Sequence, residues 1–339
     1  MDVVRRFEVA LCGYYGFGNL GDELLARAAV RLLEQCGVPR QRIVVLSNDA
    51  AETERFLGTA SVNRWNLRAV FSVLRESRTL LLGGGGLFQD TTSSRSPIYY
   101  WSLVRMAKLV NCIPWCFGQS VGPLKGKLSR ILARDALTLC KKRGVRDRFS
   151  LEELKNWGLD AFLSPDLVFG LEPFPIARST GGTRMILNIR PWRNGLPERL
   201  AENAQEYARA LGLSIRGISL SDEDTKTMED LARRGLLEVE GIDRWDPKRL
   251  DSITFPEGSR KAIGMRLHFC ILSAMAGIPL LAVPYDPKVL GFAEILGIPT
   301  WNPGMPFAVP AENSLLGIAV LREEVARIFR ETYQSLGER

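Results

Sequence analysis

Three residues that can carry charge or move a proton stand close together in the second half of the chain. Arg266 and His268 follow Gly264 at the start of a predicted helix that ends at Gly277, and His268 is the single histidine among 339 residues. Lys288 lies in a loop predicted to follow the next strand. A helix N-terminus presents free N–H groups to an anionic ligand, and an imidazole can donate a proton near neutral pH. The pattern predicts an anion-binding site that contains an acid, and the equally weighted alternative is a structural histidine.

A glycine-rich loop follows the first predicted strand, residues 7–12. Its Gly16-x-Gly18-x-x-Gly21 spacing has the letters of a dinucleotide-binding fingerprint. The acidic residue of that fingerprint is missing at the expected distance, because Asp49 stands too far along the chain. Asp22 would repel a pyrophosphate at the helix start, whereas its carboxylate could accept hydrogen bonds from sugar hydroxyls. The loop is interpreted as a sugar-binding loop or a plain turn, and an NAD site is disfavoured.

Polar residues follow several other predicted strands. Four glycines, residues 83–86, end a buried strand and lead into a polar run from Gln89 to Arg95, which could line a sugar site or be a solvated loop. Further strands are followed by Gln119, Arg146, Arg190 and Arg193. Because open α/β sheets bind ligands at the carboxyl ends of their strands, this recurrence predicts a basic cleft.

The order of the predicted elements indicates the fold class. Strands alternate with helices, which predicts an α/β protein with parallel sheets covered on both faces. A stretch rich in Pro, Gly, Ser and Thr, residues 169–182, is typical of a linker. We therefore expect two Rossmann-like domains, residues 1–168 and 183–339. Strands are predicted at 7–12, 43–46, 79–82, 115–117, 144–146, 184–189, 214–219 and 236–240, and helices at 23–35, 66–76, 96–109, 128–140, 197–211, 222–234 and 314–335.

The composition is that of an ordinary globular protein that favours anionic partners. Hydrophobic residues make up 46% and charged residues 24% of the chain, and the formal net charge is +7. No tract of five like charges points to nucleic acid, and no run of 18 apolar residues points to a membrane span. The six cysteines and one histidine lack the spacing of a metal site, so we expect no metal, reduced thiols and a cytoplasmic location.

Several segments between the first strand and Lys288 carry a family resemblance. They are the glycine-rich loop at 13–22, Gly-Gly-Gly-Gly-Leu-Phe-Gln-Asp at 83–90, Gly-Gln-Ser-Val-Gly-Pro-Leu at 118–124, Val-Arg-Asp at 145–147, Gly-Met-Arg-Leu-His at 264–268 and Tyr-Asp-Pro-Lys at 285–288. Together they resemble the polysaccharide pyruvyl transferases of the CsaB type. The resemblance implies two Rossmann-like domains facing across a cleft, as in the GT-B glycosyltransferases. It also implies transfer of the enolpyruvyl group of phosphoenolpyruvate to a sugar, giving a pyruvate ketal and phosphate.

The resemblance and the chemistry of phosphoenolpyruvate together assign roles to residues. His268 corresponds to the family's general acid, and the cations expected to bind the donor are Arg146, Arg266 and Lys288. The residues expected to bind the acceptor in the first domain are Asn19, Asp22, Gln89, Arg95 and Gln119. Phosphoenolpyruvate is a substrate, so no cofactor is expected. Phe269 stands where family members often have Ala, which bears on the shape of the pocket.

The expected partners and the alternatives complete the sequence-based prediction. The acceptor is expected to be a lipid-linked sugar of a cell-wall or extracellular polysaccharide, so the protein would work at the inner face of the membrane with peripheral contact to it, and nucleic acid is not expected. One alternative is a GT-B glycosyltransferase that uses a nucleotide-sugar, with Glu238 or Glu240 holding the ribose. Another is a non-catalytic sugar-binding protein. The acceptor sugar, the general base and the oligomeric state stay open at this level.

Overall fold

The chain forms two compact units. The computed structural model describes residues 5–91, 93, 95–172, 182–247, 253–311 and 315–337. Unit one comprises Met1–Leu171 and Leu321–Arg339, and unit two comprises Glu172–Val320. The end of the C-terminal helix thus returns to unit one, whereas the predicted boundaries place all of it in the second domain. Most of the predicted linker, residues 173–181, lies outside the described residues.

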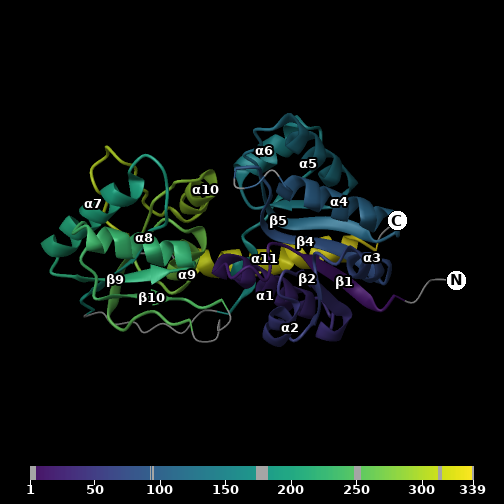
Figure 1. The fold of residues 1–339 in the computed structure, drawn as a ribbon, viewed down its shortest axis with the longest axis horizontal. Helices are drawn as coiled ribbons and strands as arrows, with labels where there is room; N and C mark the ends of the chain where they lie inside the picture. The colour runs from purple at the N-terminus through teal and green to yellow at the C-terminus, as the bar shows by residue number, and fades with distance from the viewer. Residues whose placement is uncertain are drawn as a thin grey trace. The chain divides into compact units, whose positions relative to one another are not determined.

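Unit one is built on a seven-stranded parallel sheet with the strand order β3-β2-β1-β4-β5-β6-β7 (Figure 1). The strands are β1 (Phe7–Cys12), β2 (Ile43–Ser47), β3 (Ala60–Asn63), β4 (Ser77–Phe88), β5 (Ile113–Val121), β6 (Arg143–Val145) and β7 (Phe162–Leu163). The helices are α1 (Leu20–Gln35), α2 (Ala50–Leu57), α3 (Leu67–Arg75), α4 (Arg95–Leu109), α5 (Lys127–Leu139), α6 (Arg148–Asn156) and the end of α11 (Leu315–Ser335). This order places β4 at the centre, where a parallel sheet is buried on both faces.

Two layers of helices cover the faces of this sheet. Alternate strand residues such as Cys12 and Leu82 share one core with the inner faces of α3, α4 and α5. On the other face, Trp115 and Phe117 lie 5.5 and 4.9 Å from the ring of Phe329 in α11. Figure 1 shows α4 and α5 on one side of the sheet and α1 and α2 on the other. The alternation of apolar side chains along the strands therefore accounts for both layers.

Unit two is built on a five-stranded parallel sheet with the strand order β10-β9-β8-β11-β12. The strands are β8 (Arg184–Asn188), β9 (Ser214–Ser219), β10 (Gly241–Arg244), β11 (Ser259–Gly264) and β12 (Leu280–Ala282). The helices are α7 (Leu196–Ala210), α8 (Asp222–Arg233), α9 (Leu267–Met275) and α10 (Pro287–Leu296). Nearly every residue of α9 is buried, as its apolar sequence predicts. The two parallel sheets confirm the predicted α/β class with Rossmann-like halves.

Three local predictions were wrong. The strand predicted at 236–240 lies later in the chain as β10, because the apolar side chains of Leu236, Leu237 and Val239 pack on the core from an irregular connection. The four glycines at 83–86 belong to β4, which continues to Phe88 with an irregular register. The loop expected around Lys288 is the first turn of α10. The helices α2 and α6 and the strands β3 and β7 were not predicted. Across the described part of the chain, no helix has the length and apolar character needed to cross a bilayer.

Candidate functional site

Four neighbouring strands of unit two present polar side chains at their carboxyl ends. Parallel strands share this edge, and β9, β8, β11 and β12 lie next to one another in that order. Arg190 follows β8, Ser221 follows β9, Arg266 follows β11 and Tyr285 follows β12. These four polar residues of unit two therefore all lie at one edge of its sheet.

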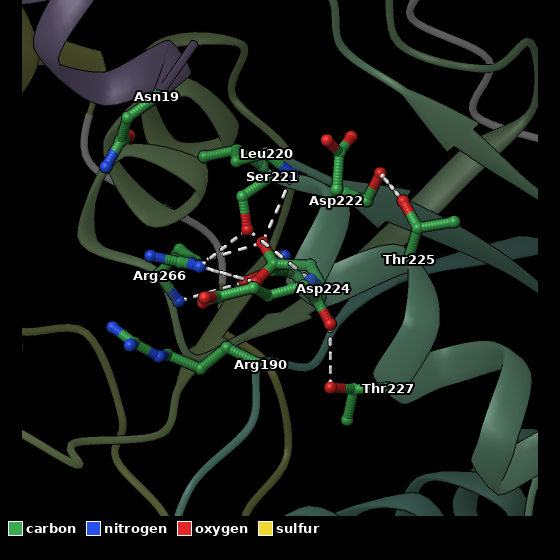
Figure 2. Close-up of polar contacts among 12 residues, drawn as sticks. Asn19, Arg190, Leu220, Ser221, Asp222, Asp224, Thr225, Thr227 and Arg266 are labelled. Atoms are coloured by element: carbon green, nitrogen blue, oxygen red, sulfur yellow. Dashed lines mark hydrogen bonds and ion pairs between the residues drawn. The ribbon is translucent and has the colours of Figure 1, made fainter. Parts of the chain in front are cut away.

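Arg266 is held by an acidic residue that the sequence analysis did not identify. Its Nη2 donates to Oδ1 of Asp224 at 2.6 Å, its Nε lies 3.1 Å from both Asp224 oxygens, and Nη2 also donates to Ser221 Oγ at 2.8 Å (Figure 2). The Asp224 side chain is 0% exposed and the Arg266 side chain 14%. Burial alone would lower the pKa of Arg266, and the adjacent Asp224 carboxylate outweighs it, so the pKa is raised. The guanidinium is therefore a fixed cation, and its Nη1 takes no part in these contacts with Asp224 and Ser221.

The start of α9 is fixed by backbone and amide contacts. Asn188, fully buried at the end of β8, donates to Ile218 O at 2.8 Å and accepts from the Arg266 N–H at 2.9 Å. Gly264 is required because a Cβ there would stand 2.2 Å from the ring of Phe269. His268 is the second residue of α9 and is half-buried. The structure thus places Arg266 and His268 at the N-terminus of α9, as predicted.

A second group of cations surrounds Tyr285. Arg190 Nη1 donates to the Tyr285 hydroxyl at 2.9 Å, and the Arg190 guanidinium carbon lies 4.7 Å from the centre of the Tyr285 ring. Lys288 Nζ lies 5.9 Å from the same ring centre and 3.6 Å from Asp286 Oδ2. Arg190 and Lys288 therefore flank one tyrosine, and Arg266 lies at the same edge of the sheet, so three cations that could bind a small dianion follow neighbouring strands.

Unit one brings the glycine-rich loop against β4. Asn19 caps α1 by accepting from the Gly21 N–H at 3.1 Å. Asp22 lies next to Gly85, since a Cβ there would stand 3.4 Å from Asp22 Oδ1. Glu23, which the sequence analysis did not single out, is 6% exposed and accepts from the Gly16 N–H at 2.7 Å. Burial raises the pKa of Glu23 from its ordinary 4.5 to about 7.

The remaining residues predicted to bind the acceptor have different environments. Gln119 is 0% exposed, and its Nε2 donates to the carbonyl oxygens of Leu82 and Gly84 at 3.1 and 3.0 Å. Gln119 therefore braces β4 in this conformation and does not reach the surface. Gln89 is half-buried and accepts from the Thr91 N–H at 2.8 Å. Arg95 is exposed at the start of α4.

Arg146 lies in a buried network of unit one, not in the cation group of unit two. Its Nη1 donates to Asp166 Oδ2 at 2.7 Å and its Nε to Ser120 Oγ at 2.8 Å. Ser120 also lies 2.8 Å from Asp147 Oδ2. The side chains of Arg146 and Asp166 are 5% and 6% exposed. Only the Nη2 edge of Arg146 lies outside these two contacts, so a ligand would have to approach it there.

Asp224, which was not predicted, has one local signal in the sequence. Asp224 belongs to a Ser221-x-x-Asp224 pattern at the start of α8, which resembles a capping box, and Ser221 does cap that helix. Its ion pair with Arg266 spans 42 positions and has no local signal. Within the described ranges, no three His, Cys, Asp or Glu side chains gather where they could hold a metal ion.

Comparisons with known proteins agree with this architecture. A family model described as polysaccharide pyruvyl transferase matches residues 19–287. No curated protein matches the chain in sequence. A putative UDP-N-acetylglucosamine 2-epimerase from Listeria monocytogenes has a similar structure, with a TM-score of 0.60 at 12% identity over 98% of this chain and 97% of that one.

Two further solved structures give the same picture. A UDP-GlcNAc 2-epimerase from Methanocaldococcus jannaschii has a TM-score of 0.58 at 9% identity, over 94% of this chain and 99% of that one. A glycosyltransferase from Rickettsia africae has a TM-score of 0.54 at 11% identity, over 97% and 94%. At such low identities the likeness establishes the fold alone, which is the GT-B fold of glycosyltransferases and epimerases.

Proposed function

The chain belongs to the polysaccharide pyruvyl transferase family, and we propose that it is a CsaB-type enzyme that uses phosphoenolpyruvate as the pyruvyl donor. The observation that carries this proposal is the set of cations at the carboxyl edge of unit two, with Arg190 and Lys288 beside Tyr285, Arg266 held by Asp224, and His268 at the start of α9. Phosphoenolpyruvate bears a phosphate and a carboxylate, and these two anions need several fixed cations. Unit two is accordingly the donor side.

The hydrogen bonds between Asp224 and Arg266 support this assignment. A freely rotating arginine would lose conformational entropy on binding, whereas Arg266 is already oriented by Asp224 and Ser221. The N–H groups at the start of α9 add a favourable partial positive charge. Arg146 is proposed as a further donor contact through its Nη2 edge. Its burial and its pair with Asp166 suit a fixed cation as well.

The proposed reaction begins with proton transfer from the His268 imidazolium to C3 of phosphoenolpyruvate. C2 becomes electrophilic, and a sugar hydroxyl oxygen forms a bond to it while its proton passes to a base. The bond between C2 and the phosphate oxygen then breaks, and inorganic phosphate leaves. A second hydroxyl of the same sugar attacks C2, loses its proton and closes the cyclic ketal. The cations of the site stabilise the departing phosphate.

The acceptor is proposed to bind unit one. Asp22 lies at the glycine-rich segment of β4, where backbone can approach a sugar closely, and Asn19 and Gln89 stand in neighbouring segments. Asp22 is the candidate base, because the Glu23 carboxyl is buried against the loop backbone. A lipid-linked sugar of a wall or extracellular polysaccharide, supplied at the cytoplasmic face of a membrane, is the proposed acceptor.

A donor screen tests the proposal without knowledge of the acceptor. Phosphoenolpyruvate at about 100 times its Kd would stabilise the fold by about 2.7 kcal/mol, which for a unit of this size raises Tm by roughly 5–10 °C. We expect Lys288→Ala, with a Kd about tenfold higher, to reduce this shift to about half at the same concentration of donor. With acceptor present, release of phosphate and a new ketal methyl signal in the NMR spectrum would complete the test. A shift with UDP-sugars at micromolar concentration, and none with millimolar phosphoenolpyruvate, would establish a nucleotide-sugar transferase instead.

A further inference from the structure

The two helix layers of unit one differ sharply in charge. The layer of α3, α4, α5 and α6, whose inner faces share one core, contains ten Lys or Arg residues and three Asp or Glu residues. Asp135 is paired with Arg105 at 2.6 Å, and Glu153 lies 3.9 Å from Arg130. The helices α1, α2 and α11 contain six Arg and eight Asp or Glu residues. The positive charge of the protein is thus concentrated on one face of unit one, which favours an anionic partner there.

The same basic layer exposes large apolar side chains. In a parallel α/β unit the N-terminal turns of the helices lie beside the carboxyl ends of the strands. Most of the exposed apolar residues of this layer lie at or near these turns, whereas Leu109, at the end of α4, lies at the other end. Leu128 and Ile131 of α5 are 61% and 63% exposed, and Trp65 just before α3 is 57% exposed. We call these side chains, with those of the neighbouring turns, the basic apolar rim: Trp65, Leu67, Phe71, Ile98, Leu128 and Ile131.

The rim is surrounded by cations. Arg68, Arg95, Lys125, Lys127 and Arg130 are all exposed at or beside the same helix starts. Single exposed apolar residues are ordinary, but several on adjacent helices of one layer mark an interaction surface. The charges around the rim are mostly positive, with Asp90 beside Lys125 and Glu153 beside Arg130 as the acids, so a second copy presenting the same rim would still be repelled. The chemistry of the rim instead suits a surface that combines negative charge with accessible hydrocarbon.

We propose that unit one docks through the basic apolar rim onto an anionic lipid bilayer. The apolar side chains would enter the interface, the lysines and arginines would lie at the anionic headgroups, and Trp65 would sit at the boundary that favours tryptophan. The carboxyl edge that holds Asn19 and Asp22 borders the rim, so a docked unit one would present this edge beside the membrane surface. The inference goes beyond pyruvyl transfer and does not depend on the identity of the donor.

Vesicle binding tests the proposal directly. The full chain is sedimented with vesicles of phosphatidylcholine alone or with about one third phosphatidylglycerol. We expect binding only to the anionic vesicles, with a steep loss between low and high salt. Arg68→Gln with Lys127→Gln should weaken binding about 25-fold, at about fivefold for each cation removed. Leu128→Ser with Ile131→Ser should weaken it at least tenfold.

Matched variants away from the rim serve as controls: two apolar residues on the part of α11 that belongs to unit two, and two arginines on the other layer of unit one. Leu316 and Val320 on α11 are 77% and 54% exposed, and Arg55 and Arg330 are exposed on α2 and α11. Leu316→Ser with Val320→Ser, and Arg55→Gln with Arg330→Gln, remove the same kinds of groups and should leave vesicle binding within about twofold of wild type. All of these side chains are exposed, so the variants should fold, which circular dichroism verifies.

Fluorescence gives an independent readout of orientation. With brominated acyl chains in the anionic vesicles, tryptophan emission should be quenched, and Trp65→Phe should lose most of that quenching. The proposal is overturned if the wild-type protein does not bind anionic vesicles or binds neutral ones equally well. It is likewise overturned if Trp65→Phe is quenched as strongly as wild type. It is also overturned if light scattering shows a dimer that Leu128→Ser converts to monomer, because the rim would then be the interface between two copies of the chain. Donor-induced stabilisation by phosphoenolpyruvate is measured without vesicles, so failure here leaves the proposed function intact.

Discussion

The buried carboxyl of Glu23 should make the stability of unit one fall as pH rises. Glu23 is 6% exposed beneath the glycine-rich loop and accepts from the Gly16 N–H at 2.7 Å. Burial raises its pKa from 4.5 to about 7, although hydrogen bonds from the backbone of Gly16 and Phe17 act in the opposite direction. The folded protein therefore keeps a proton that the unfolded chain releases above pH 4.5.

The sign and the magnitude follow from this difference. Between pH 4.5 and 7 the folded state binds more protons than the unfolded state, so the free energy of unfolding decreases with rising pH. The contribution is fully present below pH 4.5 and is lost as pH passes 7. At about 1.4 kcal/mol for each pKa unit, the separation of 4.5 from about 7 corresponds to roughly 3 kcal/mol.

Glu23→Gln should remove this pH dependence. A glutamine keeps a carbonyl oxygen for the Gly16 N–H and cannot ionise. We expect the variant and wild type to have similar stability at pH 5, and the variant to be more stable by roughly 3 kcal/mol at pH 8.5. Urea unfolding followed by circular dichroism at several pH values measures the difference. Glu54→Gln, at an exposed position on α2, controls for the loss of one charge.

Parallel stability curves for Glu23→Gln and wild type between pH 5 and 8.5 would refute the reasoning. They would mean that the carboxylate is solvated or paired well enough in the folded state to keep an ordinary pKa. A variant that is less stable by the same amount at every pH would show that Glu23 acts only as a hydrogen-bond acceptor for the loop.

The remaining predictions concern the site. His268→Ala should fold normally and release phosphate about 10²–10⁴-fold more slowly with saturating donor and acceptor, and a rate within threefold of wild type would remove His268 from the mechanism. Lys288→Ala should weaken phosphoenolpyruvate binding about tenfold or more by calorimetry while leaving acceptor affinity unchanged. Arg146→Ala should lower the free energy of unfolding by about 3–5 kcal/mol because it strands the buried Asp166 carboxylate, and unaltered urea midpoints would contradict that account. Activity should persist in excess EDTA, and a loss that Mg²⁺ restores would point to a metal-dependent transferase.

Local patterns predicted much of the fold because local interactions set the limits of helices and strands. Glycine ends α9 at Gly277, where φ is +67°, as predicted, whereas the N-cap at Asn19 begins α1 at Leu20, three residues before the predicted start. The start of α9 was predicted correctly for the same reason, and with it the positions of Arg266 and His268. The short elements β3 and β7 were missed because four and two residues carry too little periodicity to recognise.

The sequence by itself determined the α/β class, the two Rossmann-like halves and the placement of polar residues at the carboxyl ends of strands. These features depend on the alternation of strands with helices and on helix boundaries, which are set by residues close to one another in the sequence. Only the tertiary structure decided which charges are paired. Asp224 holds Arg266 across 42 positions, Asp166 holds Arg146 across 20, and Gln119 turns inward to β4. Such contacts depend on which strands lie side by side. The residue type alone does not reveal whether a charged side chain faces a ligand or a buried carboxylate.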